Sequence, residues 1–176
     1  MINFGLPILG RYVIMRTFCI LLLLCASVSA GDFPSTAQTN GFRASLYLTD
    51  SRVFETRTNG FGLPAFTRIS KVKREAWFCP AIVFSGPGLR SDGTADIVYG
   101  LVVRKPDGSV LQELDGLVVT RARFRVSDED LHLARDTQGI RIKPDNPAGT
   151  YNIVVTLEDR VKHLRVSLEK QFTIEK

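Results

Sequence analysis

The chain has 176 residues, 44% of them hydrophobic, which is enough for one domain with a substantial core. The first thirty residues hold two of the 23 basic residues and none of the 18 acidic ones, so removing them as a targeting segment would lower the net charge from +5 to +3. A net charge this small does not indicate nucleic-acid binding, and we expect no nucleic-acid partner.

An export signal is predicted in residues 1–30. Arg16 precedes an apolar run at residues 18–26, and Val28 and Ala30 suit the pockets of a signal peptidase. A basic start, a short apolar run and a cleavage site of this kind are typical of a secretory signal peptide. We therefore expect cleavage after Ala30 and a periplasmic or secreted protein. No transmembrane segment should remain, because the run is too short to span a bilayer comfortably.

Two points about this segment stay open. Met15 is an alternative to Met1 as the true start, since residues 1–14 would form a long, partly apolar leader. Cys25 offers an alternative fate, in which it heads a lipobox, is lipidated and anchors the protein to a membrane. Leu23 and Leu24 stand against the lipobox, because they are bulky where that peptidase prefers small residues.

A single domain is predicted over residues 42–176, after a flexible lead-in at residues 31–41 that is rich in Ser, Thr, Pro and Gln. Alternating apolar and polar residues predict the first strand over residues 42–49. The stretch 52–64 is polar and carries glycines, and we interpret it as an extended edge loop or a disordered segment.

The middle of the chain alternates strand and turn signals. A short strand is predicted at residues 69–72, followed by a stronger one at 76–85 that Pro80 breaks, because a proline in an apolar run indicates a bulge or an edge position. Residues 96–105 read as a strand covered on both faces, since Val98 and Val102 add apolar groups to the second face.

A tight hairpin is predicted at Pro106-Asp107-Gly108, with a returning strand at residues 110–114. The next predicted strand covers residues 118–126, with Ala122, Phe124 and Val126 facing inward. Two short extended pieces follow, around residues 131–133 and 140–142.

The last two strands give the clearest pattern. Tyr151, Ile153, Val155 and Leu157 alternate with polar residues, and residues 164–174 alternate in the same way after a polar turn. The chain shows no helical periodicity over three turns. We therefore predict an all-β fold, an antiparallel β-sandwich of about seven to nine strands.

Two stretches carry a resemblance to a known family. The run Pro-Ala-Gly-Thr-Tyr-Asn-Ile-Val-Val at residues 147–155, with the strand after it, resembles the last hairpin of immunoglobulin-like β-sandwich domains in exported bacterial proteins. The turn at residues 104–110 resembles their central hairpin, so the resemblance covers about residues 76–176. It implies an immunoglobulin-like fold, an export route and a structural corner in which Tyr151 hydrogen-bonds back to the chain. It implies no site, and the chain lacks the cysteine pair of antibody domains.

No catalytic constellation is recognisable, and we expect no cofactor and no metal. His132 and His163 are interpreted as exposed loop residues, because the only acids near His132 are those at positions 128–130. Asp92 and Asp96 flank Gly93 in a way that could ligate calcium, but the loop lacks the oxygen-rich spacing of a dedicated site. Cys79 is the only cysteine after residue 30, which excludes an intramolecular disulfide there. Its apolar neighbours predict a buried, inert thiol with a raised pKa.

A stripe of arginines is the main candidate for a binding surface. Arg121, Arg123 and Arg125 recur with a period of two, so a strand would place the three guanidinium groups on one face. They could pair with acids on a neighbouring strand or bind an anionic partner. A weaker second candidate is the basic cluster formed by Arg68, Lys71, Lys73 and Arg74.

These patterns predict a non-catalytic binding or accessory module of the bacterial envelope. Its partner would be another envelope protein or an anionic surface. Two alternatives remain at this point: an accessory subunit that is lipid-anchored through Cys25, and an enzyme whose site is not visible in the sequence.

Overall fold

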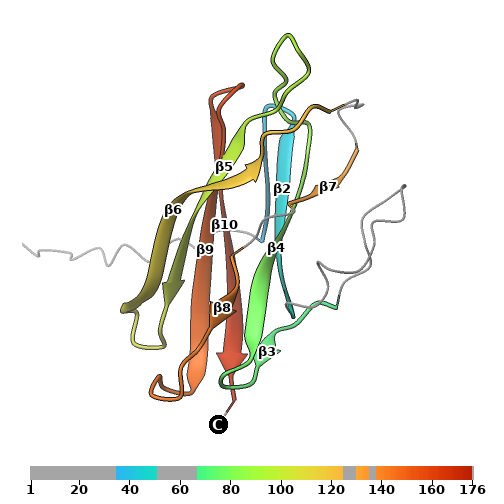
Figure 1. The fold of residues 1–176 in the computed structure, drawn as a ribbon. Coiled ribbons are helices and arrows are strands. Elements are labelled where there is room, and N and C mark those ends of the chain that lie inside the picture. Colours follow the sequence, from blue (N-terminus) through green and yellow to red (C-terminus); the bar gives the residue numbers. More distant parts are fainter. Residues whose placement is uncertain (1–34, 51–66, 125–129, 135–137, 176) are drawn as a thin grey trace, which may run out of the picture. The chain divides into compact units, whose positions relative to one another are not determined.

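The structure is a computed structural model that describes residues 35–50, 67–124, 130–134 and 138–175. Contacts along the chain divide it into two units, Met1–Ala30 and Gly31–Lys176, and every described residue belongs to the second. The described residues form no helix, and therefore none that could cross a membrane. They form ten strands in two five-stranded sheets, which confirms the predicted all-β class (Figure 1).

The strands follow one another with short connections where these are described. In chain order they are β1 (Thr36–Thr39), β2 (Phe42–Asp50), β3 (Lys71–Val72), β4 (Trp77–Ser85), β5 (Ile97–Arg104), β6 (Val110–Thr120), β7 (His132–Leu133), β8 (Ile140–Arg141), β9 (Gly149–Asp159) and β10 (Leu164–Ile174).

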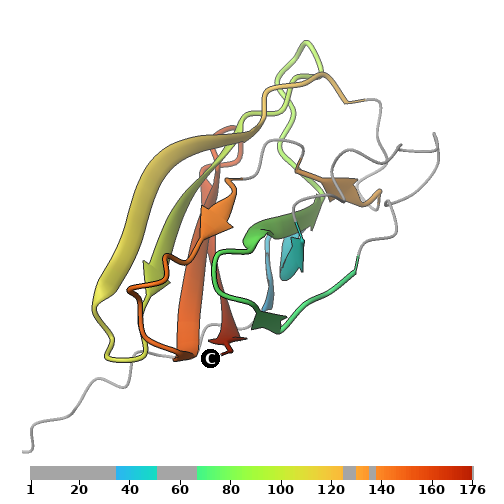
Figure 2. The same cartoon turned by 60° about the horizontal axis from the view of Figure 1, so that its bottom comes forward.

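The first sheet has the order β1-β2-β4-β7, with β8 also on β4, and the second has the order β3-β10-β9-β5-β6 (Figure 2). The strand β3 runs parallel to β10, which corrects the expectation of a purely antiparallel fold. Two-residue strands raise the count to ten in the described part, above the predicted seven to nine.

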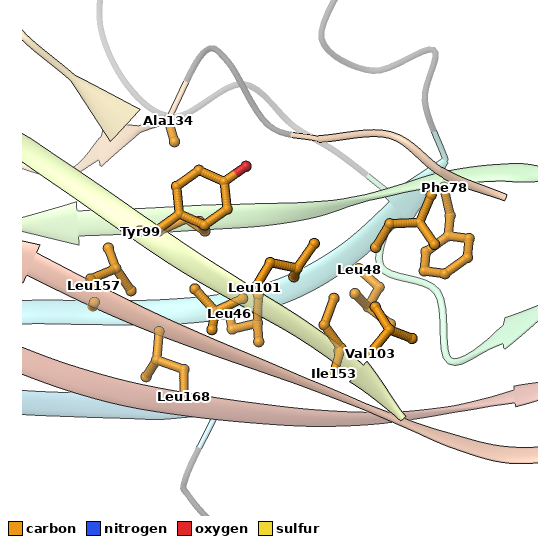
Figure 3. Packing of buried hydrophobic residues seen from close by; sticks show 14 of the residues in the cluster. Leu46, Leu48, Phe78, Tyr99, Leu101, Val103, Ala134, Ile153, Leu157 and Leu168 are labelled. Atoms are coloured by element: carbon orange, nitrogen blue, oxygen red, sulfur yellow. The ribbon is translucent and has the colours of Figure 1, made fainter. Parts of the chain in front are cut away.

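The two sheets share one hydrophobic core, as expected for a sandwich. Figure 3 shows side chains from β2, β4, β5, β9 and β10 converging in it. Leu46, Leu101 and Ile153 are 0% exposed, and burying an aliphatic side chain of this size contributes about 1.5 to 3 kcal/mol. The core therefore ties sequence-distant strands together.

The hairpin of β9 and β10 agrees with the sequence pattern. Its predicted core positions Ile153, Val155, Val166, Leu168 and Phe172 are all buried. The register pairs Phe172 with Tyr151 and Leu168 with Val155, so the inward rows of the two strands coincide. The predicted alternation of both strands is confirmed.

Tyr151 lies at the start of this hairpin, 0% exposed and stacked on Phe172 with ring centroids 5.5 Å apart. Its hydroxyl donates a hydrogen bond to the carbonyl of Pro147 at 2.8 Å. Gly149 follows that turn with φ +137°, where a side chain would be strained and a Cβ would lie 2.9 Å from Pro106 Cγ. The turn, the tyrosine and the β5–β6 hairpin are thus packed as one corner.

Pro80 does not break β4, which corrects one prediction. The carbonyl of Ile82 accepts a hydrogen bond from the amide of Ala134, on the β7 side of the strand. By alternation the nitrogen of Pro80 points to the same side. There β7 pairs only with residues 83 and 84 and β8 only with residues 77 and 78, so no ladder donor is needed at Pro80. This is the edge-like position that a proline in a strand requires.

The lead-in also differs from its prediction, because residues 36–39 form β1 rather than a flexible segment. β1 pairs antiparallel with β2 through a two-residue turn at Asn40 and Gly41, with φ angles of 44° and 78°. Asn-Gly is the preferred sequence for such a hairpin turn, since both positions need positive φ. The hairpin was therefore readable from the sequence.

Candidate functional site

Three segments meet at one end of the second sheet. The loop from β4 to β5 lies against the segment that follows β6, through hydrogen bonds from Ala95 N to Ala122 O at 3.0 Å and from Phe124 N to Gly93 O at 2.9 Å. The turn after β9 joins them, since the amide of Arg160 donates to the carbonyl of Asp96 at 2.9 Å. These backbone bonds hold the side chains of the site on a defined frame.

Asp96 forms the centre of the site. It is only 8% exposed, yet two arginines reach it. Arg90 donates from Nη2 to Oδ2 at 2.6 Å, and Arg121 Nε lies 3.4 Å from Oδ1 without hydrogen-bond geometry. The arginine side chains remain 55% and 57% exposed. One carboxylate thus orients two guanidinium groups whose outer donors face water.

The other two arginines of the predicted stripe are placed differently. The strand β6 ends at Thr120, and residues 121–124 continue as a loop with a single bridge between Thr94 and Arg123. The predicted strand over residues 118–126 is therefore wrong at residues 121–124, and Ala122 is exposed rather than inward-facing. Arg125 lies outside the described residues.

Arg123 nevertheless lies at the same end of the sheet as Arg121. It contributes to a lowered pKa of Asp92, whose main cause is the hydrogen bond from the amide of Thr94 at 2.9 Å. Its Cγ lies 3.4 Å from the position of a Cβ on Gly93. Arg121 and Arg123 are therefore brought to one region by a loop. Arg121 is partly used in an ion pair, as the alternative interpretation of the stripe expected.

A buried corner supports this end of the domain. Asp159 is 0% exposed and accepts hydrogen bonds from the backbone amides of Gly88 at 2.6 Å and of Val161 and Lys162 at 3.0 Å. Lys162 Nζ donates to Gly86 O at 2.9 Å. A Cβ on Gly88 would come within 2.9 Å of Asp159 Oδ1, so only glycine lets the loop approach. The loop that carries Arg90 is thus fixed at Gly86 and Gly88, where it leaves β4.

The remaining sequence candidates have structural surroundings. His163 is exposed in the turn after β9, as predicted. His132 is half-buried between the rings of Phe84 and Phe124 at 5.4 and 4.7 Å, which corrects its interpretation as an exposed residue. The cause is the pairing of β7 with β4. Burial lowers the pKa of His132, and Asp130 acts in the opposite direction.

Cys79 is buried, and burial raises the pKa of its thiol, with a smaller contribution from the Asp50 carboxylate. The predicted direction of this pKa shift is confirmed. Among the described residues no group of three or more His, Cys, Asp or Glu side chains could hold a metal ion. In the loop considered for calcium, Asp92 accepts a hydrogen bond from the amide of Thr94, and Asp96 is paired with Arg90.

Three residues of the weaker basic cluster have separate partners. Arg68 lies over the ring of Tyr47 at 4.3 Å, Lys71 Nζ is 3.6 Å from Glu175, and Arg74 donates to the carbonyl of Pro144 at 3.4 Å. Sequence reasoning also missed Arg90, which shares the carboxylate of Asp96 with Arg121. No local pattern signals this pair, because loop packing brings the two residues together.

No protein-family model and no curated protein matches this chain. Solved structures of several kinds are similar to it at a low level. The C-terminal domain of wzt aligns with a TM-score of 0.46 and 10% identity, over 81% of this chain and 82% of that one. A family 123 glycoside hydrolase from Clostridium perfringens, studied for glycolipid glycan hydrolysis, aligns with a TM-score of 0.43 and 7% identity, over 77% and 27%.

The third is a Niemann-Pick type C2 protein from Japanese carpenter ant, with a TM-score of 0.35 and 8% identity over 60% of this chain and 79% of that one. Likenesses at this level assign neither an activity nor a partner. The function must therefore be argued from the site itself.

Proposed function

We propose that the protein is an exported, immunoglobulin-like β-sandwich that acts as a non-catalytic binding module. The strand orders support the fold proposal. β10, β9, β5 and β6 lie in the order of the G, F, C and C′ strands of variable-type domains, and β2, β4 and the short β7 and β8 lie in the order A, B and E. The bond from Tyr151 to Pro147 O corresponds to the tyrosine corner of such domains.

The binding surface we propose is the arginine cluster, defined as Arg90, Arg121 and Arg123. The observation that carries the proposal is the convergence of Arg90 and Arg121 on the buried carboxylate of Asp96. A guanidinium held in this way loses less conformational freedom on binding an anion than a free surface arginine does. Its remaining donors match a carboxylate or a phosphate. The partner would be an acidic envelope protein or an anionic membrane surface.

A triple variant tests the surface. Replacing Arg90, Arg121 and Arg123 by Gln should weaken co-sedimentation with phosphatidylglycerol vesicles, or capture of an acidic envelope protein, by on the order of 100-fold at low salt, at about 1 kcal/mol per arginine. The effect should shrink as ionic strength rises. The matched control replaces Arg43, Arg104 and Arg141, which make the same charge change elsewhere. Equal losses in both variants would reduce the effect to net charge and refute the site.

Export is tested separately by N-terminal sequencing of the mature protein. The proposal expects a chain that starts at Gly31, after the Val28-Ser29-Ala30 site. A mature chain that begins with a lipidated Cys25 would replace this proposal with the membrane-anchored accessory subunit.

A further inference from the structure

A notch of about 280 Å³ opens on the face of the second sheet that points away from the core. Its floor lies over β5, β6 and β9, which are neighbours in the sheet (Figure 2). Val98, Val102 and Val154 provide apolar walls, and Glu113, Asp115 and Thr156 provide polar ones. The notch shares no residue with the arginine cluster, although Asp96, which Arg90 and Arg121 reach, directly precedes β5.

The notch exists because β5 has a glycine in its middle. Gly100 faces Thr156 on β9, while on β6 the register shifts between Tyr99 and Leu101, so that the residues opposite Gly100 bulge. A Cβ on Gly100 would lie 3.1 Å from Asp115 Oδ1. A side chain at this position would therefore fill the floor. A glycine in a strand interior weakens the strand, and it often marks a close approach by another group.

The charges around the notch are unbalanced. Glu158 lies at one side and is paired with Arg165 at 3.2 Å. Glu113 and Asp115 are exposed, and within the described ranges no lysine or arginine lies at ion-pair distance from either. In the described part of the chain, two carboxylates without a cationic partner therefore border an apolar depression, and Asp115 Oδ1 accepts a hydrogen bond from the amide of Gly116 at 2.8 Å. A long cationic side chain matches this combination, because its methylene stem is apolar and its head is charged.

We infer that this notch binds a lysine or arginine side chain from a basic segment of a partner protein. The stem would pack over Gly100 between Val98 and Val154, and the head would meet the carboxylates of Glu113 and Asp115. The volume is sufficient for one such side chain and lies at the lower end of small-molecule sites, which usually enclose about 300 to 1,000 Å³. The free edge of β6 is a poorer docking site, because its pairing with β5 has three register shifts.

The inference is tested on protein expressed from the full coding sequence. An acetylated, amidated Ser-Gly-Arg-Gly-Ser peptide is titrated into labelled protein and followed by amide chemical shifts, with Ser-Gly-Gln-Gly-Ser as the neutral probe. We expect saturable shifts at Val98, Gly100 and Gly116 with the arginine peptide only. Glu113→Gln with Asp115→Asn should weaken binding roughly three- to thirtyfold, the range for losing two exposed charge pairs.

Two further variants separate a binding site from general charge. Gly100→Val should abolish the shifts and leave the fold intact, because the backbone of Gly100 does not have positive φ and the nearest atom is a movable carboxylate oxygen. The control Asp145→Asn with Glu175→Gln removes the same charge elsewhere and should bind like wild type. Unchanged affinity in the Glu113 and Asp115 variant would overturn the inference. Concentration-dependent shifts at the notch without peptide would replace the partner with a second copy of this chain.

Discussion

Two aspartates at one end of the second sheet have opposite surroundings. Asp159 is the last residue of β9 and pairs in register with Ile97, the residue after Asp96. Asp159 belongs to the inward row of β9 and meets three backbone amides. Asp96 precedes the inward-facing Ile97, so its side chain points to the other face, where two arginines reach it.

The difference shows how strand parity selects the partners of a carboxylate. On the core side Asp159 accepts hydrogen bonds from three backbone N–H groups, and the bond from Gly88 fixes the loop there. On the outer side long side chains reach Asp96 while their charged heads remain in water. We therefore assign Asp159 to stability, and we assign Asp96 mainly to the orientation of Arg90 and Arg121.

The largest effect is expected from Asp159→Ala. It leaves the amides of Gly88, Val161 and Lys162 without their acceptor, and the free energy of unfolding should fall by about 3 to 5 kcal/mol. Urea denaturation measures this loss. Asp159→Asn, which keeps one carbonyl oxygen, should lose less. A loss below about 1 kcal/mol for Asp159→Ala would mean that water replaces the carboxylate and that the hydrogen bonds of Asp159 contribute little to stability.

Asp96→Ala should have a smaller effect on stability, about 1 to 2 kcal/mol, because the exposed guanidinium groups of Arg90 and Arg121 can be rehydrated. We expect the variant to bind phosphatidylglycerol vesicles more weakly than wild type. It gains positive charge, but it loses the carboxylate that orients Arg90 and Arg121. Tighter vesicle binding than wild type would show that net charge matters more than orientation, and it would weaken the contrast with Asp159.

Tyr151→Phe calibrates both results with a neutral hydrogen bond. The variant keeps the buried ring and its stacking on Phe172 but loses the hydroxyl that donates to Pro147 O. A loss of about 1 kcal/mol is expected, as for an ordinary intramolecular hydrogen bond. Thermal unfolding alongside Thr150→Ala, an exposed neighbour, measures it. Equal melting temperatures for Tyr151→Phe and wild type would show that the corner depends on packing alone.

The smallest effect is expected for the half-buried side chain of His132. Burial lowers the pKa of His132 below its ordinary value of 6.5, so the folded state favours the neutral ring. Stability should be undiminished above about pH 6.5 and fall as the pH drops from there toward the lowered pKa. His132→Phe should remove this part of the pH dependence. An unchanged slope between pH 7 and pH 5 in the variant would assign the dependence to other groups.

Much of the architecture was determined by the sequence alone. Alternation with period two specifies which residues of β2, β9 and β10 face inward, because successive side chains of a strand point to opposite faces. The turn at Pro106-Asp107-Gly108 and the neglected Asn40-Gly41 turn need only local backbone preferences. Both kinds of signal depend on neighbours in the chain, so they can be read without the fold.

The site depended on tertiary structure. Periodicity placed Arg121 and Arg123 on one face of a presumed strand, but β6 ends at Thr120 and a loop brings the two residues to the same end of the sheet. Arg90 and Arg121 come together only because both reach the carboxylate of Asp96. The notch at Gly100 likewise requires the register of β5 with β6. A sequence pattern indicates which face a side chain takes on its own strand, whereas the groups that share that face come from distant segments, and only the packed fold brings them together.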